Sequence, residues 1–156
     1  MLEPGAMAAY LIAFVLANWP TIHGQQERDM RADAEEVAAT DCDAQACLRL
    51  MGIAALESGF RRDAVGAAGE RGAWQVMPPA TSYGAREALR RMRTQGLLGY
   101  IGCRRAADVV VIRGTRTTCA AMIAHRIERA DLWRMAFDPP REVAAPFATT
   151  RVALAQ

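Results

Sequence analysis

The chain contains no lysine and only 2 histidines among its 156 residues. All 19 basic residues are arginines, and 17 acidic residues leave a net charge of +2. An excess this small argues against a nucleic-acid-binding protein, because such proteins carry a clear basic surplus. His23 lies far in the sequence from both pairs of cysteines, and His125, six residues after Cys119, completes no set of zinc ligands, so we expect no zinc or other metal site.

The sequence also lacks a hydrophobic run long enough to cross a bilayer. Its most apolar stretch, residues 6–17, has roughly twelve residues where a spanning helix needs about 20. Glu3 precedes it and no arginine does, whereas a signal peptide begins with a basic segment. We favour a buried helix over residues 6–18 as part of the domain. A signal peptide or a membrane anchor remains the alternative.

Several catalytic motifs are absent as well. The chain has no G-x-S-x-G, P-loop, G-x-G-x-x-G or H-E-x-x-H pattern. A serine-hydrolase elbow, a phosphate-binding loop, a dinucleotide site and a zinc-protease helix are therefore not predicted. We expect no cofactor.

The length favours one domain over residues 1–140, followed by a surface tail over residues 141–156. An even number of cysteines suggests the disulfides Cys42–Cys47 and Cys103–Cys119 in an oxidising compartment, although four reduced cysteines remain an alternative. Hydrophobic periodicity predicts a mainly helical chain with a small hairpin over residues 108–118. The expected helices cover residues 27–40, 44–58, 82–95 and 119–137, with a loop over 61–79 and a tight turn over 97–103.

In the helix predicted over residues 27–40, apolar residues recur at Met30, Ala34 and Val37, and the charged residues, Asp33 among them, are placed on the other side. Arginines at 86, 90, 91 and 93 form a basic face on a later helix, which we interpret as solvated or as contacting an anionic polymer.

Glu57 stands at the end of the strongly apolar helix predicted over residues 44–58. Burial there would hold the acid protonated, as glycosidic cleavage requires. The glycine-rich loop that follows carries Trp74, whose flat ring could support a sugar, and Gln75, whose amide can both donate and accept hydrogen bonds. This combination indicates a glycosidase.

The run that ends at Pro78 reads A-A-L-E-S-G-F-R-R-D-A-V-G-A-A-G-E-R-G-A-W-Q-V-M-P. It resembles the signature of the soluble lytic transglycosylase family, E-S-x-F, then A-V, then G-x-x-G-x-x-Q-x-M-P. The match covers about a sixth of the chain. The acidic helix from Glu27 and the cysteine-bounded turn after it resemble the versions found in phage-encoded members.

The resemblance implies a lysozyme-like domain with a small hairpin or loop region at a groove for peptidoglycan strands. It implies that Glu57 protonates the oxygen between MurNAc and GlcNAc and then acts as base on the MurNAc 6-hydroxyl, which gives a 1,6-anhydro product. Ser58 and Gln75 would line the groove. The family's A-Y-N-x-G motif is replaced by G-Y-I-G, so Tyr100 is the candidate for the tyrosine that orients the acid. Trp74 stands where the family has a smaller apolar residue.

Two alternatives follow from other residues. A second carboxylate, Glu70 or Asp63, would make the chain a hydrolytic muramidase. The altered Tyr100 region also fits a glycan-binding or particle-associated structural protein without turnover. The expected partners are peptidoglycan strands and components of a phage particle or envelope complex. The expected location is the periplasm, the cell envelope or a phage virion.

Overall fold

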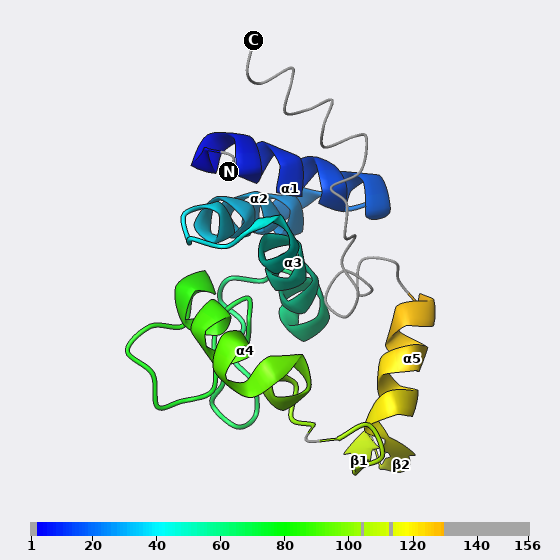
Figure 1. The fold of residues 1–156 in the computed structure, drawn as a ribbon. Coiled ribbons are helices and arrows are strands. Elements are labelled where there is room, and N and C mark those ends of the chain that lie inside the picture. The colour runs from blue at the N-terminus through cyan, green and yellow to red at the C-terminus, as the bar shows by residue number, and fades with distance from the viewer. Residues whose placement is uncertain (1–2, 104, 113, 130–156) are drawn as a thin grey trace.

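The computed structural model describes residues 3–103, 105–112 and 114–129 and shows a mainly helical chain, as predicted (Figure 1). Within these residues the elements are α1 (Pro4–Asn18), α2 (Gly24–Ala38), α3 (Ala44–Ser58), α4 (Ala85–Tyr100), β1 (Val109–Ile112), β2 (Thr115–Thr118) and α5 (Cys119–Arg129). The helices α1 to α4 share one apolar core, and α5 lies apart from it with the two strands.

The first helix, α1, packs on α2 and belongs to the core. Met7, Tyr10, Leu11 and Val15 are all buried. The residues for which a buried helix was expected therefore lie in α1, whose apolar side chains pack in the core. Among the described residues, no helix is both long enough and apolar enough to cross a membrane.

The second helix begins at Gly24, earlier than predicted, and it buries one charged residue. Asp33 lies on the same side as Met30, Ala34 and Val37, and none of the four is exposed to solvent. Our placement of Asp33 on the polar side of the helix was wrong. Helical spacing explains the error, because positions three and four residues apart share a face and Asp33 follows Met30 by one such step.

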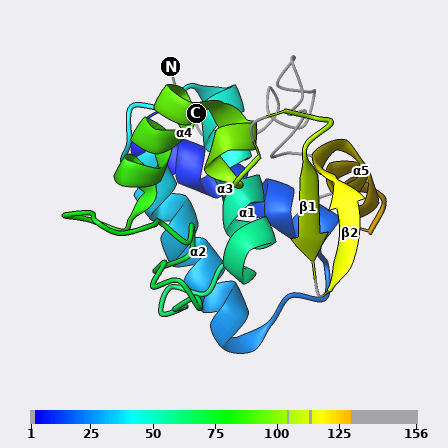
Figure 2. The same cartoon turned by 90° about the horizontal axis from the view of Figure 1, so that it is seen from below.

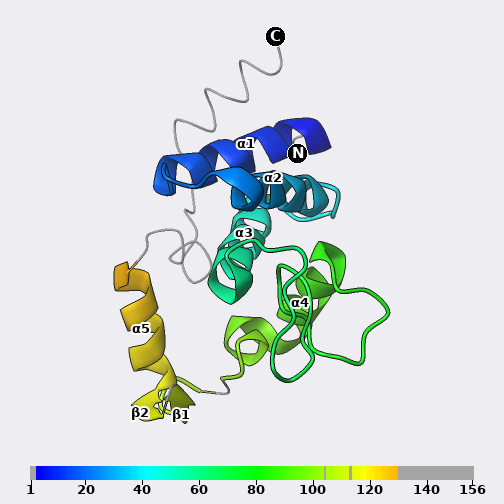
Figure 3. The same cartoon turned by 180° about the vertical axis from the view of Figure 1, so that it is seen from behind.

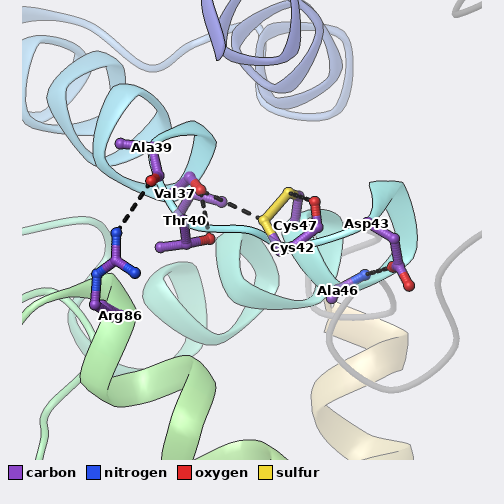
Figure 4. Close-up of a disulfide and its surroundings, with 8 residues drawn as sticks. All are labelled: Val37, Ala39, Thr40, Cys42, Asp43, Ala46, Cys47 and Arg86. Carbon is purple, nitrogen blue, oxygen red and sulfur yellow. Dashed lines mark hydrogen bonds between the residues drawn. A yellow bond between two sulfur atoms is a disulfide. The ribbon is translucent and has the colours of Figure 1, made fainter. Parts of the chain in front are cut away.

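A tight turn joins α2 to α3 (Figure 4). The Thr40 hydroxyl donates to the carbonyl of Val37 at 2.7 Å, and the predicted Cys42–Cys47 disulfide bridges the turn. Asp43 then accepts a hydrogen bond from the Ala46 N–H at 2.8 Å, which makes it the N-cap of α3.

The third helix has the predicted bounds and runs through the core. Leu50, Ile53 and Ala54 are fully buried. The helix ends at Gly59, whose φ of 62° is left-handed, and Phe60 follows with a φ of 69°. Glycine tolerates this conformation without strain, so Gly59 can end the helix.

The fourth helix continues beyond its predicted end. Gly96 interrupts it with a φ of 73°, but helical turns resume and reach Tyr100. The tight turn expected over residues 97–103 is therefore largely helical. The loop of residues 61–84, which precedes α4, runs alongside it in Figures 1 and 3. That loop carries only isolated bridges, from Val65 to Arg71 and from Arg71 to Val76.

The predicted hairpin is present as β1 and β2, which pair antiparallel with Val109 opposite Thr118. It packs on α5, as Figure 2 shows, and the expected Cys103–Cys119 disulfide ties this unit to the end of α4. Cys103, Cys119 and Met122 form a small core separate from the main one. Residues 130–137 of the predicted last helix and the predicted tail, 141–156, lie outside the described residues.

Candidate active site around Glu57

Glu57 lies in the last turn of α3, where the buried helix meets the 61–84 loop. Its side chain is only partly buried, while Leu50, Ile53 and Ala54 on the same helical face are fully buried. The end of the helix is held by Gln26, whose amide donates to the carbonyl of Gly59 at 2.8 Å. The protein thus places one carboxyl group at the edge of its core, on a backbone that α2 and α3 both fix.

Tyr100 lies within electrostatic reach of Glu57. Burial raises the pKa of Tyr100, and the neighbouring charge of Glu57 raises it further. The phenol donates its only proton to the carbonyl of Trp74 at 2.6 Å. Its oxygen can then only accept, which suits a carboxylic acid that carries a proton. The continuation of α4 beyond Gly96 brings Tyr100 to this position.

Ser58 and Gln75, both expected to line a groove, hold the loop in place. The Ser58 side chain is 8% exposed, and its hydroxyl lies 2.7 Å from the carbonyl of Ala73, to which it donates. The Gln75 amide nitrogen donates to the carbonyls of Gly72 at 2.9 Å and Ala64 at 3.2 Å. Because these donors are used inside the loop, the expectation of direct substrate contact is corrected for Ser58 and for the Gln75 amide nitrogen.

Trp74 does not provide a surface for a sugar. It is 1% exposed, and its indole N–H donates to the carbonyl of Leu50, in the middle of α3, at 2.8 Å. The expectation that Trp74 binds substrate was therefore wrong. A large apolar ring gains more from burial in the core than from exposure, and its N–H found a partner there.

The far end of the loop is fastened to α4 by Arg91. Its guanidinium donates to the carbonyls of Met77 and Pro79, the latter at 2.8 Å, and pairs with Glu87 at 2.8 Å. Hydrogen bonds from Arg90 and Arg91 lower the pKa of Glu87 to about 2, so this carboxylate stays ionised. The sequence suggested only a basic helical face here, and no local pattern identified Arg91 as the residue that holds the loop.

The two candidates for a second carboxylate both lie in the 61–84 loop. Glu70 folds back on its own loop, where it accepts a hydrogen bond from the Ala68 N–H at 3.1 Å. A Cβ atom added to Gly66 would lie 1.7 Å from Glu70 Oε1, so this carboxylate is packed against the loop backbone. Asp63 is exposed.

Glycine is required at Gly72, which shapes the loop between Glu57 and Gln75. Its φ is 82°, and a Cβ atom there would lie 2.8 Å from the carbonyl oxygen of Tyr83. Gln75 adopts a left-handed φ of 48° close by. The backbone of residues 72–75 is therefore bent and held from both sides, by α3 through Ser58 and by α4 through Tyr100.

The arrangement as a whole presents one partly exposed carboxyl group beside a phenol, on a rigid frame. Such a group can give a proton to a leaving oxygen and take one back, which is general acid and base chemistry. Two cavities of the described part of the chain lie elsewhere: Glu57 lines neither the one beside Asp33 nor the one beside Arg86.

Comparison with known proteins gives this chain no family by similarity. No family description, no curated protein and no solved structure matches it.

Proposed function

We propose that this chain cleaves peptidoglycan glycan strands as a lytic transglycosylase, with Glu57 as its single acid and base. The observation that carries the proposal is the position of Glu57, partly exposed at the end of a buried helix and within electrostatic reach of the Tyr100 phenol. The motif around Glu57 and the loop up to Pro78 supports the same reading.

The proposed reaction runs in two proton transfers. Glu57 donates its proton to the oxygen between MurNAc and GlcNAc, and the bond from that oxygen to the MurNAc anomeric carbon breaks. The substrate's acetamido group stabilises the developing positive charge. Glu57 then accepts the proton of the MurNAc 6-hydroxyl as its oxygen bonds to the anomeric carbon, which closes the 1,6-anhydro ring. Tyr100 positions the carboxyl group by offering its phenol oxygen as an acceptor.

The surroundings of Glu70 favour the transglycosylase over the muramidase. A retaining or inverting hydrolase needs a second carboxylate that faces the acid across the sugar. Glu70 is instead hydrogen-bonded within its own loop and packed against Gly66. A single carboxyl group suffices for the anhydro route.

The direct test compares Glu57→Gln with the parent chain on purified sacculi. We expect at least a 100-fold slower loss of turbidity for the variant, because general acid catalysis is worth about 10²–10⁴-fold. Glu70→Gln is the matched control, since it removes a nearby charge while keeping a hydrogen-bond acceptor for the Ala68 N–H. We expect it to retain the parent's rate within about two-fold.

Mass spectrometry of the released fragments separates the alternatives. Anhydro-muramyl ends support the proposal, whereas reducing ends together with a slow Glu70→Gln variant would establish the muramidase. Binding to sacculi without any released fragment would leave a glycan-binding protein. Equal rates for Glu57→Gln and the parent would refute the role of Glu57.

A further inference from the structure

One of the two cavities lies between α2 and residues 62–84, and Glu57 is not among its lining residues. Its volume is about 280 Å³, and its polar lining comes from Asp33 and Glu36 of α2 and from Arg62, Arg71 and Tyr83 of the loop. Ala73 and Trp74 also line the cavity. Their carbonyls are the ones that accept the hydrogen bonds from Ser58 and Tyr100.

Asp33 lines this cavity and has one side-chain oxygen without a hydrogen-bond partner among the described residues. The side chain has 0% exposure, and its Oδ1 accepts a hydrogen bond from Arg62 Nη1 at 2.7 Å. Its Oδ2 has no hydrogen-bond donor among the described residues. When Asp33 is ionised, a buried carboxylate oxygen without a donor is costly, so the ionised form calls for a hydrogen-bond donor from outside the chain.

Two arginines line the cavity, and they differ in whether a carboxylate of the described residues already pairs with them. Arg62 already bridges Asp33 and Glu36, the latter at 3.5 Å. Glu36 is held against Gly84, where a Cβ atom would lie 2.4 Å from its Oε1. Arg71 instead stacks on the ring of Tyr83 at 5.4 Å, and among the described residues it pairs with no carboxylate. Its planar guanidinium can therefore receive a carboxylate from a ligand.

We propose that this cavity binds a small zwitterion, with the ligand's ammonium group donating to Asp33 Oδ2 and its carboxylate pairing with Arg71. An acceptor deep in the pocket and a cation at its exposed edge match the ammonium and carboxylate of an amino-acid end. A divalent metal ion fits poorly, because the Arg62 guanidinium occupies the space between the two carboxylates.

Two sources offer this chemistry, namely a free amino acid and the stem peptide of the wall. Some stem peptides carry a diamino acid whose side chain ends in an ammonium and a carboxylate on the same carbon. Assignment to the stem peptide rests on the proposed function, whereas binding of the zwitterion itself does not.

Ligand binding is linked to the loss of the proton of the Asp33 carboxyl group. Burial raises the pKa of Asp33 to about 8, the charges of Glu36 and Asp29 add to this, and Arg62 opposes it. Asp33 is thus largely protonated at pH 7, and a bound ammonium group would favour its ionised form. We therefore expect binding to release protons and to become tighter as the pH rises from 6 to 8.

The experiment is titration calorimetry on the full chain, with probes that contain no glycosidic bond and so cannot be cleaved by the proposed reaction. The probes are free meso-diaminopimelate and a tripeptide stem that contains it. We expect heat of binding, with proton release revealed by buffers of different ionisation enthalpy. Mono-amide and N-acetyl forms of the probe, which lack one of the two charges, should bind at least ten-fold more weakly.

Asp33→Asn and Arg71→Gln should each weaken binding ten-fold or more, whereas Arg93→Gln, an exposed arginine of α4, should not. Arg71 is itself exposed, so its variant keeps the test valid if Asp33→Asn fails to fold. Equal binding of both probes assigns the site to free amino acids, and binding of the tripeptide alone assigns it to the wall.

No heat with either probe at 10 mM (a deliberately high concentration), or binding that neither substitution changes, would overturn the proposal and leave a buried water as the partner of Asp33. The outcome is independent of catalysis. If Glu57→Gln lyses sacculi as fast as the parent but the free zwitterion still binds, then only the proposed function fails.

Discussion

The burial of Trp74 gives a prediction that separates a structural role from a substrate-binding one. Replacing Trp74 by alanine would remove the largest fully buried side chain of the described residues from the contact between the loop and α3. If Trp74 holds the loop, this change lowers the free energy of unfolding. If the ring instead contacted a sugar, the change would slow catalysis and leave the folded state as stable as before.

The size of the effect follows from what the residue contacts. Truncating a fully buried tryptophan to alanine costs about 3–5 kcal/mol, which is a large share of the roughly 5–15 kcal/mol that stabilises a typical domain. Trp74→Phe isolates a smaller part of this free energy. It removes the hydrogen bond from the indole N–H to Leu50, while the Leu50 carbonyl keeps its helical partner, so we expect about 1 kcal/mol from that bond.

The assay is urea unfolding followed by circular dichroism, with wall lysis measured in parallel. Trp74→Ala should lower the unfolding midpoint by about 1 M urea or more, given slopes of about 1–3 kcal/mol per M. Met77→Ala serves as the control, because Met77 lies in the same loop and is 48% exposed. It should leave the midpoint nearly unchanged. An unchanged midpoint for Trp74→Ala, combined with lost activity, would refute the packing role.

Two further predictions concern pH and the disulfides. The unfolded chain releases the proton of Asp33 near its usual pKa of 3.8 and the folded chain keeps it to about 8, so the stability should fall as the pH rises through that interval. Asp33→Asn should flatten this fall in melting temperatures taken from pH 4 to pH 8, and parallel curves for parent and variant would contradict the linkage. The Cys103–Cys119 disulfide closes a separation of 16 residues and is worth about 3 kcal/mol. Replacing both cysteines by serine should raise hydrogen exchange in residues 109–129 while α3 stays protected, and equal loss of protection in α3 would show that the two cores are coupled.

The local features of this chain followed from its sequence. The bounds of α3, the N-cap at Asp43 and the stop at Gly59 depend on residues within one turn of each other. The hairpin over β1 and β2 was likewise predicted from a valine run and a nearby glycine. Helical periodicity also placed Glu57 at the end of a buried face, which α3 confirms.

The errors arose where the hydrogen-bond partner of a side chain lies far from it in the sequence. The indole N–H of Trp74 donates to the carbonyl of Leu50, and the phenol of Tyr100 donates to the carbonyl of Trp74. No sequence pattern near Trp74 indicates either hydrogen bond. Asp33 was placed on the polar face because charged residues are usually solvated, yet Arg62, 29 residues further on, provides the partner that makes burial tolerable.

The sequence alone thus determined most of the helices, the hairpin and the one acid at the end of α3, because each depends on local spacing and burial. It suggested the two disulfides without fixing their pairing. The tertiary structure decided which side chains hold the 61–84 loop and which remain available to a ligand. Those roles depend on which donors and acceptors come together from distant parts of the chain. A local sequence pattern does not indicate these pairs. For this reason Trp74, Ser58 and Asp33 changed their roles, while Glu57 kept the position that the sequence predicted.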